Sequence, residues 1–177
     1  NDVPMDAGSS ISTSVQVLSG NGVCDEKLWP YDITKFAVQP PANCYAASAP
    51  NKAITYKKVA NAIIPSLLKQ CIADGFPFIF GFTVYESFES DQVATTGIVP
   101  MPSKDATGNI NEQVVGGHAV MAVAYDDSKK AFKCRNSWGT NWGQKGYFWI
   151  PYDYLTNTFL ASDFWTVELI NDILNLN

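Results

Sequence analysis

Histidine and positive charge are both scarce in this sequence. A single histidine occurs in 177 residues, and 12 lysine and arginine residues stand against 17 aspartate and glutamate residues, for a net charge of −5. An acidic chain without a basic cluster is a poor match for nucleic acid or an anionic membrane surface, so we expect neither as a partner. No apolar run is long enough to span a bilayer.

Motifs for bound cofactors are lacking as well. One histidine and four scattered cysteines have no metal-ligand spacing, and neither a phosphate-binding loop nor a dinucleotide-binding motif occurs. We therefore expect no metal and no cofactor. Internal repeats and low-complexity tracts are also missing, and the length suits one domain or two half-domains that share an interface.

The four cysteines allow three pairings. Cys24 and Cys44 lie in loop-like contexts, and a disulfide between them would close a loop of about 20 residues and contribute roughly 3 kcal/mol in the chain-entropy model. Cys71 falls in a helical pattern and Cys134 in a strand pattern, so both are expected to be buried as small apolar groups. The sequence leaves open whether Cys24 and Cys44 are bonded or free, and it does not identify the redox compartment.

Hydrophobic periodicity changes in character near residue 75. Before that point the pattern favours helices at 9–19 and 65–75 and a long proline-containing irregular segment at 29–50. Beyond it, strands are expected at 76–85, 118–125, 131–136, 146–150 and 164–169, with mostly loop at 91–116. Helices followed by strands indicate an α+β fold, which we divide into residues 1–75 and 76–177.

Two short motifs carry the chemistry of the chain. Gly-Gly-His-Ala at 116–119 contains the lone His118, and Asn-Ser-Trp-Gly at 136–139 contains Asn136, at the ends of two strands joined by a predicted hairpin. Imidazole is a suitable base near neutral pH, and an asparagine oxygen that accepts the Nδ1–H would orient it without adding charge. The tryptophans and glycines around Asn136 suit an aromatic shield that excludes water from this contact.

A structural role for both residues is the plainer alternative. A lone histidine at the start of a strand is commonly structural, and an isolated asparagine is commonly a turn or cap residue. The composition around Asn136 favours the catalytic interpretation, because two tryptophans and several glycines within twelve residues are unusual for an ordinary strand.

Residues 116–150 resemble the C-terminal half of the papain-like cysteine peptidases, through the His-Ala pair and the run Asn-Ser-Trp-Gly-x-x-Trp-Gly-x-x-Gly-Tyr. Weaker similarity extends back to Gly75-Phe76-Pro77-Phe78, Leu28-Trp29-Pro30-Tyr31 and Asp6-Ala7-Gly8-Ser9. The resemblance implies a two-lobe fold, in which 1–75 is the remainder of a helical lobe and 76–177 an antiparallel, barrel-like β lobe. It also favours an extracellular or lysosome-like compartment.

The resemblance further implies roles for individual residues. His118 would be the general base and later the acid, Asn136 would orient it, and Trp138 would cover their hydrogen bond. Ala119 would lie near the pocket for the second substrate residue upstream of the cut, and Gly8 would offer backbone hydrogen bonds to an extended peptide. Peptides or proteins are the expected substrates.

The nucleophile that such a site requires is not recognisable in this sequence. The family motif Cys-Gly-(Ser/Ala)-Cys-(Trp/Tyr) is absent, and its usual distance of some 130–150 residues before the histidine points upstream of residue 1. Cys24 precedes two carboxylates, which raise a thiol pKa, and Cys44 follows prolines and is not expected to begin a helix.

Three interpretations follow from the missing nucleophile. The first, which we favour, is a cysteine peptidase whose nucleophile lies on a segment or chain outside these residues. The second is a catalytically inactive papain-like module that binds peptides, and the third is another acyl transfer that uses cysteine, histidine and asparagine.

Overall fold

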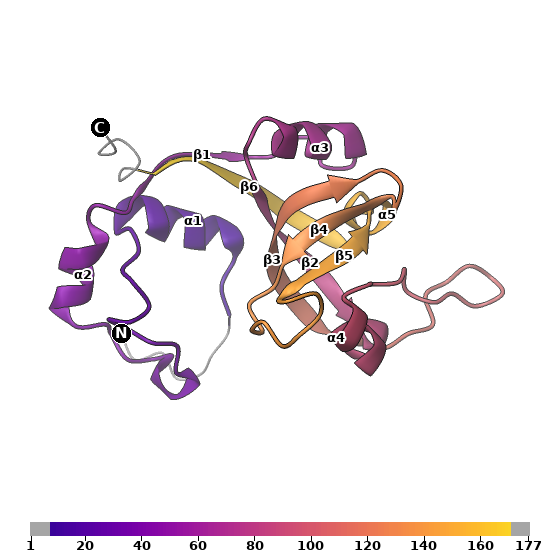
Figure 1. The fold of residues 1–177 in the computed structure, drawn as a ribbon, viewed down its shortest axis with the longest axis horizontal. Coiled ribbons are helices and arrows are strands. Elements are labelled where there is room, and N and C mark those ends of the chain that lie inside the picture. The colour runs from indigo at the N-terminus through magenta and orange to yellow at the C-terminus, as the bar shows by residue number, and fades with distance from the viewer. Residues whose placement is uncertain (1–7, 171–177) are drawn as a thin grey trace. The chain divides into compact units, whose positions relative to one another are not determined.

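The computed structural model describes residues 8–170, which form two compact units (Figure 1). One unit contains residues 8–57 and 167–170, and the other contains residues 58–166. This division differs from the expected boundary near residue 75, because residues 58–75 group with the strands that follow them. Within 8–170, no helix has the length and apolar character needed to cross a membrane. Asp6 and Ala7 of the predicted glycine-containing loop lie outside the described residues.

The first unit contains helices α1 (Ile11–Gly20) and α2 (Ala42–Ser48), the 3-10 helix η1 (Ile33–Lys35) and strand β1 (Ala53–Lys58). Helix α1 confirms the helix expected at 9–19: the Ser10 hydroxyl accepts a hydrogen bond from the Thr13 amide, and Ile11 and Val15 are buried on one face.

The segment 29–50, expected to be irregular, contains a helix. Helix α2 begins directly after Pro41, whose backbone is extended, and the helix is rich in alanine. The expectation that Cys44 does not begin a helix is therefore wrong, since it lies in the first turn of α2. Strand β1 was not predicted either.

The second unit consists of helices packed with an antiparallel sheet. Its elements are α3 (Pro65–Ala73), β2 (Phe78–Tyr85), η2 (Glu86–Glu89), α4 (Asp91–Thr96), β3 (Val114–Asp126), β4 (Ala131–Arg135), β5 (Tyr147–Pro151), α5 (Tyr152–Leu155) and most of β6 (Ala161–Ile170). The strand order is β1-β6-β2-β3-β4-β5 (Figure 1). Helix α3 and strands β2 to β6 confirm the predicted elements at 65–75, 76–85, 118–125, 131–136, 146–150 and 164–169 and the α+β fold class. Helix α4 is an exception, because it lies in the expected loop at 91–116.

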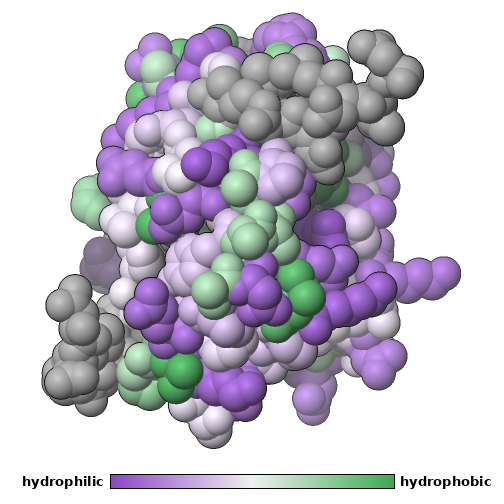
Figure 2. Space-filling model, turned by 90° about the vertical axis from the view of Figure 1, so that its left-hand side faces the viewer, coloured by the Kyte–Doolittle hydropathy of each residue, from purple (hydrophilic) through white to green (hydrophobic). Residues whose placement is uncertain are grey.

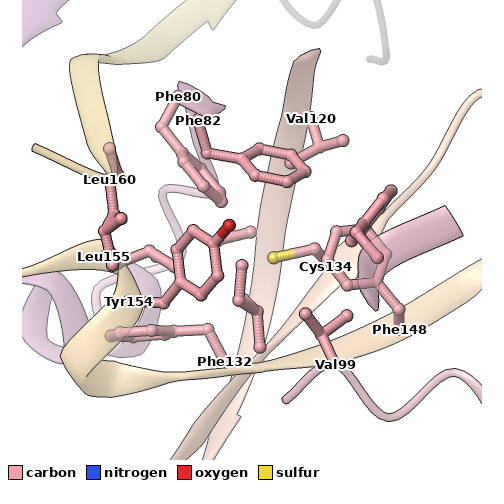
Figure 3. Close-up of a cluster of buried hydrophobic side chains, with 14 of the residues drawn as sticks. Phe80, Phe82, Val99, Val120, Phe132, Cys134, Phe148, Tyr154, Leu155 and Leu160 are labelled. Carbon is pink, nitrogen blue, oxygen red and sulfur yellow. The ribbon is translucent and has the colours of Figure 1, made fainter. Parts of the chain in front are cut away.

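One face of this sheet forms the core. Alternate residues of β2 are buried, with Phe78 and Phe80 fully covered. Strands β4 and β5 contribute Phe132 and Phe148, which lie in the same cluster as Phe80 (Figure 3). Cys134 lies among these rings, and burial raises the pKa of its thiol strongly. Each aromatic ring removes a large apolar area from water, so this core holds the strands that carry the site in register.

Candidate active site

The hairpin formed by β3 and β4 brings His118 and Asn136 together. His118 lies on β3 opposite Phe82 of β2, and Asn136 directly follows the last residue of β4. The Nε2 atom of His118 lies 2.8 Å from the Oδ1 atom of Asn136. The side chain of Asn136 is buried and that of His118 half-buried. The structure thus joins the two residues that the motifs singled out, and all of their contacts described below lie within residues 58–166.

A second hydrogen bond determines the proton positions in this pair. The backbone amide of Ser137 donates to Oδ1 of Asn136 over 2.8 Å, which identifies that atom as the oxygen. Because an oxygen accepts and does not donate, His118 Nε2 carries the hydrogen that is shared with Asn136. In the neutral ring Nδ1 then bears a lone pair. The prediction that Asn136 accepts from Nδ1–H is therefore wrong, because the ring presents its other nitrogen to the amide.

Aromatic rings hold the imidazole in this orientation. The Trp138 ring stacks on His118 with 5.0 Å between centroids and a 24° interplanar angle, and Phe82 meets it edge-on at 5.8 Å. Trp138 remains 42% exposed, so it forms the solvent side of the shield. Such cover strengthens the hydrogen bond beneath it, because water is excluded and the local dielectric is lower. Trp138 thus stacks on the His118 ring, and its predicted part in the site stays a prediction.

Phe88 supports this shield from below and was not predicted. Its ring is 1% exposed and contacts Trp138, Trp142 and Phe148 with centroid separations of 5.4–5.6 Å. It comes from the short 3-10 helix η2, in the sequence Glu-Ser-Phe-Glu, which has no apolar periodicity. No local signal in the sequence points to this residue, because its importance arises from rings that are distant along the chain.

The glycines of the motif allow the backbone of the loop 136–147 to fold tightly, so that its two ends meet. The backbone N–H of Asn136 donates to the Gly146 carbonyl oxygen over 2.9 Å, which joins the two ends of the loop. Gly143 has a φ of +58°, and a Cβ atom there would lie 2.5 Å from the Tyr147 carbonyl oxygen. A side chain at Gly143 is therefore excluded both by the backbone conformation and by space.

One polar atom of the site lacks a partner among the described residues. The Nδ2 atom of Asn136 is buried, and no acceptor within residues 8–170 hydrogen-bonds with it. A buried donor without an acceptor costs about 1–3 kcal/mol. This cost is tolerated at the end of β4, where Oδ1 of the same amide accepts two hydrogen bonds.

Ala119 and Gly8, the other predicted substrate contacts, lie in different compact units. Ala119 follows His118 on β3, pairs with Gly81 and is exposed, as a substrate contact requires. Gly8 belongs to the other compact unit, is exposed and has a φ of +69°. The roles of Ala119 and Gly8 in substrate binding remain predictions.

All four cysteines are free thiols in the structure. Cys134 is fully buried, as predicted, whereas the prediction that Cys71 is buried is wrong: it is half-buried, and its thiol donates to the Phe76 carbonyl oxygen over 3.1 Å. Burial raises the pKa of the Cys44 thiol, and the adjacent Cys24 raises it further. Cys24 and Cys44 are both free thiols in the structure, so the disulfide between them stays a prediction. In the described part of the chain, no three histidine, cysteine or acidic residues are grouped to hold a metal ion.

Comparisons with known proteins agree with this geometry. The family described as "Papain family cysteine protease" matches residues 6–163. The "Uncharacterized peptidase C1-like protein L477" of Acanthamoeba polyphaga mimivirus is 39% identical over 97% of this chain and 55% of that protein. Chymopapain of Carica papaya is 29% identical over 79% of this chain and 36% of its own length.

A solved structure shows the same fold. Xylellain, a cysteine protease from Xylella fastidiosa, superposes with a TM-score of 0.78 and 40% identity, over 92% of this chain and 62% of that one. The chain thus spans roughly one to two thirds of the length of these relatives. The predicted papain-like α+β fold is confirmed, and the chain belongs to the papain family of cysteine proteases.

Proposed function

We propose that this chain supplies the histidine and asparagine of a cysteine peptidase, and that the nucleophilic cysteine comes from residues outside these 177. The observation that carries the proposal is the hydrogen bond of His118 Nε2 with Asn136 Oδ1, because it leaves Nδ1 as the basic nitrogen of the ring. The greater length of the relatives is consistent with a nucleophile elsewhere, since this chain spans 55% of the viral protein and 62% of xylellain.

The proposed reaction uses Nδ1 as both base and acid. Nδ1 of His118 takes the proton of the cysteine thiol, and the thiolate attacks the carbonyl carbon of a peptide bond. The imidazolium returns the proton to the leaving amine, which departs and leaves an acylated cysteine. Nδ1 then removes a proton from water, which hydrolyses the thioester and releases the acid and the thiolate.

Asn136 and Trp138 act on the ring and not on the substrate in this proposal. Asn136 accepts from Nε2–H in every protonation state of the ring, so the orientation of Nδ1 does not change as the proton moves. Trp138 excludes water from that hydrogen bond. Peptides or proteins are the proposed substrates, with Ala119 beside the second residue upstream of the cut and Gly8 on the backbone of the extended chain.

Labelling with a thiol-reactive peptide epoxide tests this proposal. The full-length natural protein would be treated with the epoxide, digested, and searched by mass spectrometry for the modified residue. We expect one labelled cysteine outside these 177 residues, with labelling abolished by His118→Ala and retained in Asn141→Ala, a change at an exposed position of the same loop.

Other outcomes would overturn the proposal. Peptide binding without labelling or hydrolysis would identify an inactive peptide-binding module. Transfer of the acyl group to an added amine in place of water, as the main product, would identify a different acyl transferase. Labelling that persists in His118→Ala would show that the ring does not activate the thiol.

A further inference from the structure

The segment before Cys24 is held tightly against the end of helix α2. The Val23 amide donates to the Asn51 carbonyl, and Asn51 Nδ2 donates back to the Val23 carbonyl, each over 3.2 Å. The Ser48 hydroxyl donates to the Asn21 carbonyl over 2.7 Å. The fit is close, because a Cβ atom added at Gly22 would lie 2.1 Å from the Ser48 carbonyl oxygen.

This arrangement brings Cys24 next to the helix that carries Cys44. Cys44 lies four residues, about one helical turn, before Ser48 and is 3% exposed. Its Sγ atom lies 3.8 Å from the Leu28 carbonyl oxygen, and Cys24 is close enough to raise the pKa of the Cys44 thiol. Cys24 is only half-buried, so a dissolved reagent can reach one of the two sulfurs.

The chain between the two cysteines has no core of its own. Every residue in 25–43 is described, and none of them is buried. Tyr31, Ile33, Phe36 and Val38 are between 49% and 81% exposed. Figure 2 shows one face of the molecule, on which hydrophobic residues are scattered among hydrophilic ones. A segment without buried side chains is held mainly at its ends, so the contact at its base determines how well it is anchored.

We propose that Cys24 and Cys44 are a redox pair, which a low-molecular-weight disulfide such as oxidised glutathione converts into an intrachain disulfide at the base of the loop 24–44. The Cys24 thiolate attacks one sulfur of the reagent, giving a mixed disulfide and one reagent thiolate, which takes up a proton. Cys44 then loses its proton and attacks the Cys24 sulfur, and the second reagent thiol leaves. Two protein thiols are oxidised and one reagent disulfide is reduced to two thiols.

The order of these steps follows from burial. The raised pKa of the Cys44 thiol and its small exposure make it a poor first attacker of a dissolved reagent. Once Cys24 carries the mixed disulfide, its sulfur is held near Cys44 by the hydrogen bonds of residues 21–23 to residues 48 and 51, and the second step is intramolecular.

Peptide mapping of the oxidised full-length protein tests the proposal. After equilibration with reduced and oxidised glutathione, free thiols are alkylated and the unreduced protein is digested with trypsin. Cleavage after Lys27, Lys35 and Lys52 separates the two cysteines, so a disulfide appears as a joined pair of peptides that reduction splits. We expect this pair, with Cys71 and Cys134 alkylated as free thiols.

Two further measurements give the size of the effect. The equilibrium constant for the disulfide should be on the order of 100-fold larger in the native protein than in the urea-unfolded protein, because folding has already brought the loop ends together. Oxidation should raise the thermal midpoint by roughly 5–10 °C. Cys24→Ser and Cys44→Ser should abolish this shift, and Cys71→Ser should keep it.

Equal equilibrium constants in native and unfolded protein would overturn the proposal, and so would a mixed disulfide that stays on Cys24 without forming the link. The peptide map of the unsubstituted protein gives an answer even if a serine variant fails to fold.

Discussion

Replacing Asn136 with alanine should lower catalytic activity, because His118 loses its orienting partner, while the free energy of unfolding changes little. The substitution removes the Oδ1 atom, which accepts hydrogen bonds from His118 Nε2 and the Ser137 amide, each over 2.8 Å. Each of these hydrogen bonds contributes about 1 kcal/mol net to the free energy of unfolding. The substitution therefore removes roughly 2 kcal/mol of stabilising interaction.

The same substitution also removes a destabilising group. Asn136 Nδ2 is buried and has no acceptor among the described residues, at a cost of about 1–3 kcal/mol. The two contributions nearly cancel, so we expect the free energy of unfolding of Asn136→Ala to lie within about 1 kcal/mol of the unsubstituted value. Urea denaturation measures this difference.

Activity is expected to respond differently. Without an acceptor at Nε2, the ring loses its fixed orientation and tautomer, and the base Nδ1 is presented for only part of the time. In the full-length protein, kcat for a fluorogenic peptide should fall about 100-fold, within the range that general acid–base catalysis contributes, with KM nearly unchanged. Asn141→Ala, on the exposed part of the same loop, is the matched control and should leave both parameters unchanged.

The reasoning would be refuted by the opposite pattern. A loss of more than about 3 kcal/mol in stability with unchanged kcat would mean that Asn136 is a structural residue of the hairpin and that His118 needs no orienting partner.

The remaining predictions concern the support of the site and the acid stability of the fold. Phe88→Ala should lower the free energy of unfolding by about 3–5 kcal/mol, measured in urea, because it leaves a cavity beneath the shield; a loss below about 1 kcal/mol would contradict the packing described. Gly143→Ala should destabilise by more than about 2 kcal/mol, since its Cβ meets the Tyr147 carbonyl oxygen, whereas Gly108→Ala, at a positive φ with open space, should cost only about 1–2 kcal/mol. Hydrogen bonds, first from the Lys69 ammonium, hold the pKa of Asp127 below its ordinary value. The unfolded chain therefore binds the proton more readily, and the free energy of unfolding falls as the pH drops below about 4. Asp127→Asn should reduce the change of the urea midpoint with pH between about pH 5 and 3, and an unchanged pH dependence would contradict this assignment.

Most of the sheet could be predicted from the sequence because its strands combine strong local signals. The aromatic run of β2 and the apolar stretch of β3 are long enough to identify a buried strand, and the turn after Asp126 indicates a hairpin. The meeting of His118 and Asn136 follows from that hairpin.

The elements that were missed are short. Helix α4 has six residues and no apolar periodicity, although the Ser90 hydroxyl caps it by accepting from the Val93 amide and Gly97 ends it in the left-handed conformation. Helix α2 lies in a proline-containing segment whose pattern predicts irregular structure, although the helix itself is rich in alanine.

The errors at the site concern geometry that no linear pattern contains. Which nitrogen of His118 meets Asn136 depends on how Trp138 and Phe82 pack on the ring, and these contacts join separate elements. Phe88 was missed for the same reason, since its role depends on the rings that surround it. The motif therefore identifies the residues of the pair, whereas packing determines which atoms meet.

Long-range ¹H–¹⁵N NMR of the His118 imidazole in the full-length protein tests the proposed arrangement most directly, and comparison with His118→Ala identifies the signals of this ring. At a pH where the ring is neutral, we expect the pattern of a ring protonated at Nε2, with a slowly exchanging Nε2–H that is lost in Asn136→Ala. A ring protonated at Nδ1, or an equal mixture of the two tautomers, would show that Asn136 does not orient His118 and that Nδ1 is not held ready as the base.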